Sequence, residues 1–252
     1  MFLVTLNYLT INLSRNMSIL FISDLHLSED EPKTIEIFLK FLTDTAPNAE
    51  ALYILGDFFE VWVGDDENTA LHQKVSSALS KLAKKGVKVY FMHGNRDFLI
   101  GNTFAGRAHF TIIEDPTIIK PYGLDILLMH GDTLCIDDEN YQKFRKKARN
   151  RFYQKVFLML PLFLRRKIAA SMRNASKKYT TSTDTAIMDV NTDEVLKVSQ
   201  KYACKLIIHG HTHRPAIHKG NDIIRVVLSD WHGQGQYAEL TPENEILIKR
   251  IS

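Results

Sequence analysis

Five short polar clusters in this sequence carry side chains that bind metal ions. Carboxylate, imidazole and amide oxygen together make a ligand set for a hard-to-borderline divalent cation. Any one cluster alone is ordinary turn chemistry, but turn chemistry gives no reason for His at four of these positions. The series therefore predicts a binuclear metal site. In chain order the clusters are Asp24-Leu25-His26, Gly56-Asp57, Gly94-Asn95-Arg96-Asp97, His130-Gly131-Asp132 and Gly210-His211-Thr212-His213.

Each cluster follows a short apolar run that we predict to be a buried strand. Side chains just past the C-terminal ends of neighbouring strands converge in open α/β sheets, so the clusters should meet at one edge. Apolar spacing further predicts helices. The predicted strands are 19–22, 51–55, 87–92, 126–129, 206–208, 223–228, 236–240 and 246–251, and the predicted helices are 32–44, 71–85, 98–106 and 184–202.

Charge is distributed unevenly along the 252 residues. Residues 140–183 contain 13 Lys or Arg and no acid, which leaves 19 basic and 29 acidic residues elsewhere. With 45% hydrophobic residues the chain can bury a large core. We predict one α/β domain over 17–252, an acidic body that carries a basic helical insert at about 137–183.

The insert combines its charge with a nine-residue apolar run, 156–164, interrupted only by Pro161 and followed by Arg165-Arg166-Lys167. Basic flanks around a bulky apolar patch are typical of an element that lies on an anionic membrane. Nucleic-acid binding is the rival for such charge, but bulky apolar side chains suit acyl chains better than phosphates. We expect a peripheral membrane contact and no nucleic-acid partner. A helical cap whose apolar face packs on the body is a third interpretation, compatible with the first.

The N-terminus, the cysteines and the lengths of the apolar runs give further expectations. Residues 1–16 lack a basic n-region and a cleavage site, and we expect a disordered extension or an upstream start. No run reaches 18 apolar residues, so no transmembrane helix is expected. Neither Cys135 nor Cys204 lies in a metal-binding pair such as C-x-x-C, and we expect both to be packing residues. Two isolated cysteines are typical of a protein in a reducing cytosol. His72 is expected at the surface, and the chain is expected to be a monomer.

The pattern D-x-H, G-D, G-N-R-D, H-G-D and G-H-T-H resembles the calcineurin-like metallophosphoesterase superfamily. The phrases SDLHL, LYILGDFFEVWVGDD, HGNRDFL, LMHGDTLCIDD and IHGHTHRPAIH resemble its branch that acts on a nucleotide-linked acyl sugar. The resemblance implies a sandwich of two mixed β-sheets flanked by helices, with a helical cap insertion. The ligand set of oxygen and nitrogen without thiolate favours manganese, iron or zinc over copper, and the resemblance implies two divalent ions with manganese as the metal.

The resemblance implies how the ligands divide between the two ions. Asp24, His26 and His213 would hold one ion, and Asn95, His130 and His211 the other. Asp57 is the expected bridge, because a carboxylate offers two oxygens to two ions at once. Water between the cations would attack phosphorus in line. The implied catalytic residues are Asp57, Asn95, Arg96 and His130.

Arg96 departs from the wider superfamily, where most members have His. An Arg does not donate its proton to a leaving group, but it can clamp phosphate oxygens with two parallel hydrogen bonds. That suits a pyrophosphate substrate, whose leaving phosphate ester needs little protonation. The structural alternative is a salt bridge to Asp97 or another surface acid.

The resemblance to this branch implies that the chain hydrolyses the pyrophosphate bond of UDP-2,3-diacylglucosamine. It also implies that the reaction takes place at the cytoplasmic face of the bacterial inner membrane. The substrate contacts carried over by position are Asn95, Arg96, Asp138, Ser176, Thr180, Thr183 and His211. Thr180 stands where the branch has Asn. Thr183 stands where it has Lys, so the contact at 183 lacks that charge. The rival functions are hydrolysis of a soluble nucleotide and a non-catalytic scaffold of the same fold.

Overall fold

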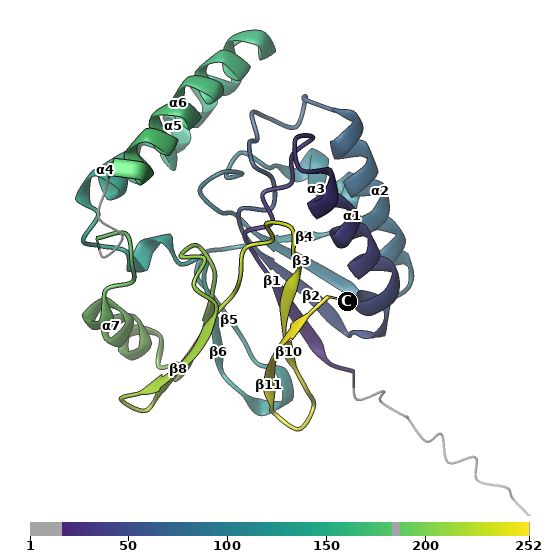
Figure 1. Ribbon diagram of the computed structural model, residues 1–252, viewed down its shortest axis with the longest axis vertical. Helices are drawn as coiled ribbons and strands as arrows, with labels where there is room; N and C mark the ends of the chain where they lie inside the picture. The colour runs from purple at the N-terminus through teal and green to yellow at the C-terminus, as the bar shows by residue number, and fades with distance from the viewer. Residues whose placement is uncertain (1–16, 183–186, 252) are drawn as a thin grey trace, which may run out of the picture.

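The computed structural model describes residues 17–182 and 187–251, and its two β-sheets pack face to face with helices on the outside (Figure 1). The expected extension at 1–16 and the expected substrate contact Thr183 lie outside the described residues. The predicted class, two mixed sheets flanked by helices, is confirmed.

The first sheet has the order β11-β10-β1-β2-β3-β4. Its strands β1, β2, β3 and β4 run parallel to one another. The second has the order β5-β6-β7-β9-β8, with β6, β7 and β9 parallel. The strands of the first sheet are β1 (Ile19–Ile22), β2 (Ala51–Leu55), β3 (Lys88–Met92), β4 (Thr111–Ile113), β10 (Gln236–Leu240) and β11 (Ile246–Arg250). Those of the second are β5 (Thr117–Ile119), β6 (Ile126–Leu128), β7 (Leu206–His209), β8 (Ala216–Gly220) and β9 (Ile223–Val227).

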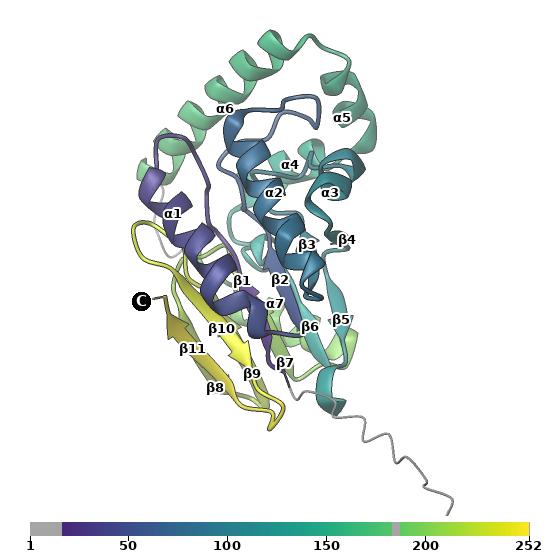
Figure 2. The ribbon, with the colours of Figure 1, turned by 90° about the vertical axis from the view of Figure 1, so that its right-hand side faces the viewer.

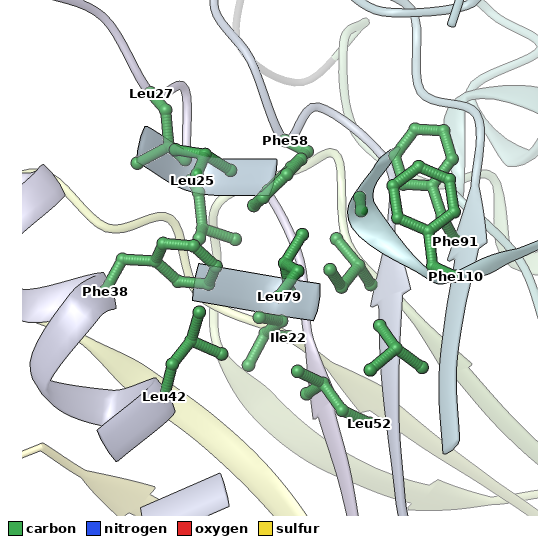
Figure 3. Packing of buried hydrophobic residues seen from close by; sticks show 14 of the residues in the cluster. Ile22, Leu25, Leu27, Phe38, Leu42, Leu52, Phe58, Leu79, Phe91 and Phe110 are labelled. Carbon is green, nitrogen blue, oxygen red and sulfur yellow. The ribbon is translucent and has the colours of Figure 1, made fainter. Parts of the chain in front are cut away.

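Strand alternation divides the core into layers, because successive side chains point to opposite faces of a sheet. Ile19 and Phe21 of β1 pack in the cluster between the two sheets. Leu20 and Ile22 join the cluster beneath the helices, part of which is drawn in Figure 3. Both faces of the central strands are therefore buried, as their continuous apolar sequence requires.

Four helices cover the outer faces of the sandwich. Phe38 of α1 (Pro32–Lys40), Leu79 of α2 (Ala70–Lys84) and Phe104 of α3 (Asn102–Ala108) pack on the first sheet. Val195 of α7 (Thr192–Tyr202) packs on the second. The predicted stop of α2 is confirmed, since Gly86 follows it with φ +98°, a conformation that glycine adopts without strain.

The basic insert forms three helices, α4 (Glu139–Ala148), α5 (Arg151–Leu158) and α6 (Leu162–Ser182). We call them the cap. They stand above the sheets in Figures 1 and 2, with Pro161 directly before α6. Among the described residues, no helix is long and apolar enough to cross a bilayer.

Several local expectations were wrong. The helix expected from residue 184 begins at Thr192, because the side chain of Asn191 caps it by accepting from the Glu194 N–H at 3.1 Å. The helix expected over 98–106 begins at Asn102. Strands β4, β5 and β8 were not expected. His72 is buried and not at the surface, because its ring packs on Phe59 and Trp62, and its Nδ1 lies 2.9 Å from the Glu67 carbonyl oxygen.

Candidate metal centre

The ligand-bearing loops continue the strand pairing past the ends of β1 and β2. The N–H groups of Asp24 and His26 donate to the carbonyls of Gly56 and Asp57, both at 3.0 Å. Between these ligands, Leu25 is buried in the core under the helices (Figure 3). The chain thus alternates a ligand toward the site with a leucine toward the core, and packing fixes where the ligands point.

Five of the predicted ligands have left-handed backbone conformations that non-glycine residues rarely adopt. Such conformations cost on the order of 1–3 kcal/mol each and persist where the surrounding structure over-determines them, often at functional sites. The residues and their φ angles are Asp24 (54°), His26 (50°), Asp57 (50°), His211 (69°) and His213 (55°). The concentration of strain on these residues marks the loops as a functional site.

Close approach of the loops explains a glycine in the third cluster. A Cβ added to Gly94 would lie 2.1 Å from the backbone nitrogen of Asp57 and 2.2 Å from its Oδ1. Only a residue without a side chain lets the loop after β3 meet the loop after β2.

The first ligand group comprises Asp24, His26 and His213, whose ligand atoms lie within 4.8 Å of one another. Nε2 of His26 is 3.3 Å from Nε2 of His213, which is 3.4 Å from Oδ1 of Asp24. These three atoms converge on one point, as ligands of a single ion do.

The second group comprises Asp57, His130 and His211, again within 4.8 Å. Asn95 joins it through Oδ1, which is 2.9 Å from Nε2 of His130 and 3.0 Å from Nδ1 of His211. The structure therefore gathers all seven predicted ligands into two adjoining groups, divided as the family resemblance implied.

Asp57 lies between the groups and turns one oxygen to each. Its Oδ2 is 4.0 Å from Nε2 of His26, and its Oδ1 is 3.7 Å from Nε2 of His130. A carboxylate placed in this way can hold two cations at once.

Buried partners orient the ligands from behind. Nδ1 of His130 lies 2.9 Å from the Leu55 carbonyl, which leaves Nε2 free for a metal. The carboxylate of Asp97 accepts from the N–H groups of Phe58 (2.7 Å) and Gly94 (2.8 Å) and so ties two ligand loops together. Burial, helped by the nearby Asp57 charge, raises the pKa of Asp97 to about 6.

The donor set fits divalent cations. Oδ1 of Asp24 is fully buried and has no hydrogen-bond partner, a costly state for a carboxylate oxygen that an ion would relieve. Burial opposes a charge on His130, but Asp57 and Asp132 outweigh it and raise its pKa to about 9. Burial and the neighbouring His130 lower the pKa of His211 to about 4, which keeps it neutral. The group therefore attracts positive charge and offers an imidazole ready to bind a cation.

Arg96 lies beside the second group without an acidic partner. No carboxylate among residues 17–182 and 187–251 forms an ion pair with its guanidinium, and the Asp97 carboxylate is engaged by backbone N–H groups. Its Nε is buried and unpaired. The salt-bridge alternative therefore finds no support in the described residues, and the guanidinium remains available to bind an anion.

The predicted substrate contacts separate into two sets. Asn95, Arg96 and Ser176 line a cavity of about 980 Å³ under the cap. Asp138 is instead buried, caps α4 by accepting from the Tyr141 N–H at 2.9 Å, and accepts from the Tyr179 hydroxyl at 2.7 Å. Thr180 is exposed and does not line the cavity. The roles of Asp138 and Thr180 in substrate binding stay predictions.

Sequence reasoning missed two side chains close to the ligands. Oε2 of Glu60 lies 2.7 Å from Nδ1 of His26, and the ring of Tyr141 lies 5.8 Å from that of His211. Glu60 sits in the aromatic loop after Asp57, where nothing in its spacing marks it. Tyr141 belongs to the basic insert, and only the folded chain brings it to the centre.

Comparison with known proteins places this geometry in a family. The model of the calcineurin-like phosphoesterases matches residues 17–215. The UDP-2,3-diacylglucosamine hydrolases of Salmonella arizonae and Salmonella typhi are each 48% identical over 236 residues, covering 92% of this chain and 98% of theirs. Among solved structures, an archaeal phosphodiesterase gives a TM-score of 0.48 at 14% identity, covering 93% of this chain and 99% of that one, too low a similarity to bear on chemistry. On the family model and these relatives, the chain belongs to the calcineurin-like phosphoesterases, a family of metal-dependent hydrolases.

Proposed function

We propose that the chain hydrolyses the pyrophosphate bond of UDP-2,3-diacylglucosamine to UMP and 2,3-diacylglucosamine 1-phosphate. The observation that carries this is the cavity of about 980 Å³ beside the metal ligand Asn95. Its walls come from both the body and the cap and include Trp62, Phe98, Leu99, Phe144, Phe157 and Met172. A large apolar cavity at a phosphoesterase centre suits a phosphate ester that carries acyl chains.

We propose Mn²⁺ as the ion of both groups. The ligand set, with oxygen and imidazole nitrogen and no thiolate, suits manganese, iron or zinc better than copper, and the family resemblance selects manganese among these. When bound, the two cations would polarise the phosphoryl oxygens and acidify water between them. Asp57 would fix the spacing of the two ions through its two oxygens.

Arg96 would bind the leaving phosphate. Its backbone N–H donates to Oδ1 of Asp57 at 2.8 Å, so the residue is anchored to the proposed bridging ligand. The guanidinium fork can hold two phosphate oxygens in parallel. A sugar phosphate leaves as an anion and needs no proton from the enzyme, which agrees with an arginine in place of an acid.

We propose that the chain attaches as a monomer to the cytoplasmic face of an anionic inner membrane, and the outer surface of the cap supports the lipid contact. Large apolar side chains face solvent there, with Met159 84% and Phe152 68% exposed. Lys155 of α5 and Lys167 of α6 are exposed as well. Apolar side chains that enter the acyl boundary beside cations that meet lipid phosphates are the features of an interfacial element.

Two rival functions explain fewer features of the structure than lipid hydrolysis does. A soluble nucleotide substrate gives no reason for an apolar cavity or for exposed apolar side chains on the cap. A non-catalytic scaffold gives no reason to gather seven metal ligands, five of them in strained conformations.

The test is hydrolysis of UDP-2,3-diacylglucosamine beside UDP-glucose and a diadenosine polyphosphate, in detergent micelles with Mn²⁺. Fast cleavage of the lipid alone is the expected result. Equal cleavage of all three would reject the lipid assignment while keeping the metal chemistry. No cleavage of any of them, with metal bound, would favour the scaffold.

A further inference from the structure

Glu60 connects a metal ligand to the cap. It lies three residues after Asp57, and its side chain is 16% exposed. One carboxylate oxygen, Oε2, lies 2.7 Å from Nδ1 of His26. The other, Oε1, contacts Nη2 of Arg173 on α6. Each oxygen therefore has its own partner, one on either side of the boundary between body and cap.

The orientation of His26 shows what the first contact does. Its Nε2 faces the site, at 3.3 Å from Nε2 of His213 and 4.0 Å from Oδ2 of Asp57. Its Nδ1 faces away, toward the Glu60 carboxylate, at ion-pair distance but without the alignment of a hydrogen bond. A carboxylate behind a metal-binding imidazole fixes the ring and raises its basicity. Glu60 is placed to act in this way on the Asp24, His26 and His213 group.

The second contact ties that carboxylate to the insert. Arg173 lies in the middle of α6, and its Nη1 also donates to the Glu60 backbone carbonyl at 3.5 Å. Among the described residues, Glu60 is the only acid that pairs with Arg173. The seating of α6 thus determines whether the Glu60 carboxylate has a counter-charge on its outer oxygen.

We propose that Glu60 and Arg173 are positioning residues that couple the seating of the cap to metal binding at the Asp24, His26 and His213 group. A seated cap holds Glu60 against His26 and strengthens that metal position. Linkage makes the effect reciprocal, so an ion bound there stabilises the seated cap by the same free energy. This coupling involves the metal site and the cap alone and is the same whatever the substrate is.

Arg166 provides a matched control on the same helix. Its Nε pairs with Oε1 of Glu67 at 2.6 Å, which also joins α6 to the body, and neither residue contacts a metal ligand. Replacing Arg166 removes a cap-to-body ion pair and leaves the route through Glu60 and His26 intact.

The experiment is a titration of the metal-free full chain with Mn²⁺. Calorimetry measures the affinity of each binding event, and electron paramagnetic resonance detects the spin-coupled pair of ions. Arg173→Met and Glu60→Gln should each weaken one of the two binding events by about ten- to a hundredfold. The double variant should lose no more than the larger single loss. Arg173→Lys should recover part of the affinity, and Arg166→Met should bind as the parent does.

Hydrogen exchange tests the reciprocal effect. Mn²⁺ should slow amide exchange around Arg173 in the parent chain and in Arg166→Met, but not in Glu60→Gln. Parental Mn²⁺ affinity in either Arg173→Met or Glu60→Gln would overturn the proposal. An equal loss in Arg166→Met would overturn it too, because the cause would then be general loosening of the cap.

Discussion

The metal centre and the cap are held in place in opposite ways. At the centre, Asp24 and His130 are fully buried, and the loops are joined by backbone hydrogen bonds and packed leucines. The cap rests on the body through a few arginines and keeps large apolar side chains in solvent. Arg165, for example, is buried and donates to the Val63 carbonyl at 2.6 Å, while Met159 nearby in sequence is 84% exposed.

This contrast indicates a division of tasks. Catalysis needs ligands held to within fractions of an ångström, and buried strand ends supply that rigidity. Choosing a lipid substrate needs apolar surface that becomes covered only when lipid is present. Each of the following variants should impair either the metal centre or the cap and leave the other intact.

The largest loss is expected for Asp57→Ala at the centre. The change removes the carboxylate that faces both ligand groups, so both ions should bind more weakly and turnover should fall by several orders of magnitude. Metal content and kcat would be measured together. Asp222→Ala, at a carboxylate whose side chain is 90% exposed, serves as the control. Near-normal turnover in Asp57→Ala would contradict the assignment.

Arg96→Lys should have the next largest effect. It keeps the charge and loses the guanidinium fork, so kcat/KM should fall by roughly a hundredfold, as for loss of one transition-state hydrogen-bond donor. Mn²⁺ affinity should stay at the parental value, because no predicted metal ligand has changed. Parental turnover and substrate affinity in this variant would refute a phosphate-binding role.

Met159→Asp should have the smallest effect on chemistry and act on membrane attachment. Removing one apolar side chain from a lipid contact costs on the order of 1.5–3 kcal/mol, or about a tenfold or greater loss in vesicle affinity. Binding to vesicles of anionic phospholipid would be measured by sedimentation. Leu247→Asp, at a side chain of β11 that is 39% exposed, is the matched control. Equal losses in the two variants would argue against a specific role of the cap.

The sequence predicted the strands that carry ligands more accurately than the elements around them. Runs such as 51–55 are apolar throughout and end in glycine, so their period and their end are both visible. Strands β4 and β8 are edge strands of their sheets, and their burial depends on neighbours distant in sequence. The start of α7 was missed because hydrophobic spacing continues before residue 192, while the Asn191 cap decides where the helix begins.

At the metal centre, too, some features could be predicted from the sequence and others could not. His and Asp after a strand are visible as a pattern, which is why the structure gathers the seven expected ligands. The left-handed conformation of Asp57 and the contact of Glu60 with His26 arise only when loops from different strands meet. No local spacing in the sequence encodes such contacts.

The most direct test of the division of tasks is to fill the cavity of the cap and measure two substrates with one enzyme. Ala169 of α6 lines that cavity and is not a predicted metal ligand. In Ala169→Trp, kcat/KM for UDP-2,3-diacylglucosamine should fall by roughly five- to 150-fold, since overfilling an apolar site costs about 1–3 kcal/mol. Mn²⁺ affinity and the slow hydrolysis of UDP-glucose should stay at parental values. Equal losses on both substrates, or no loss on the lipid, would contradict the account.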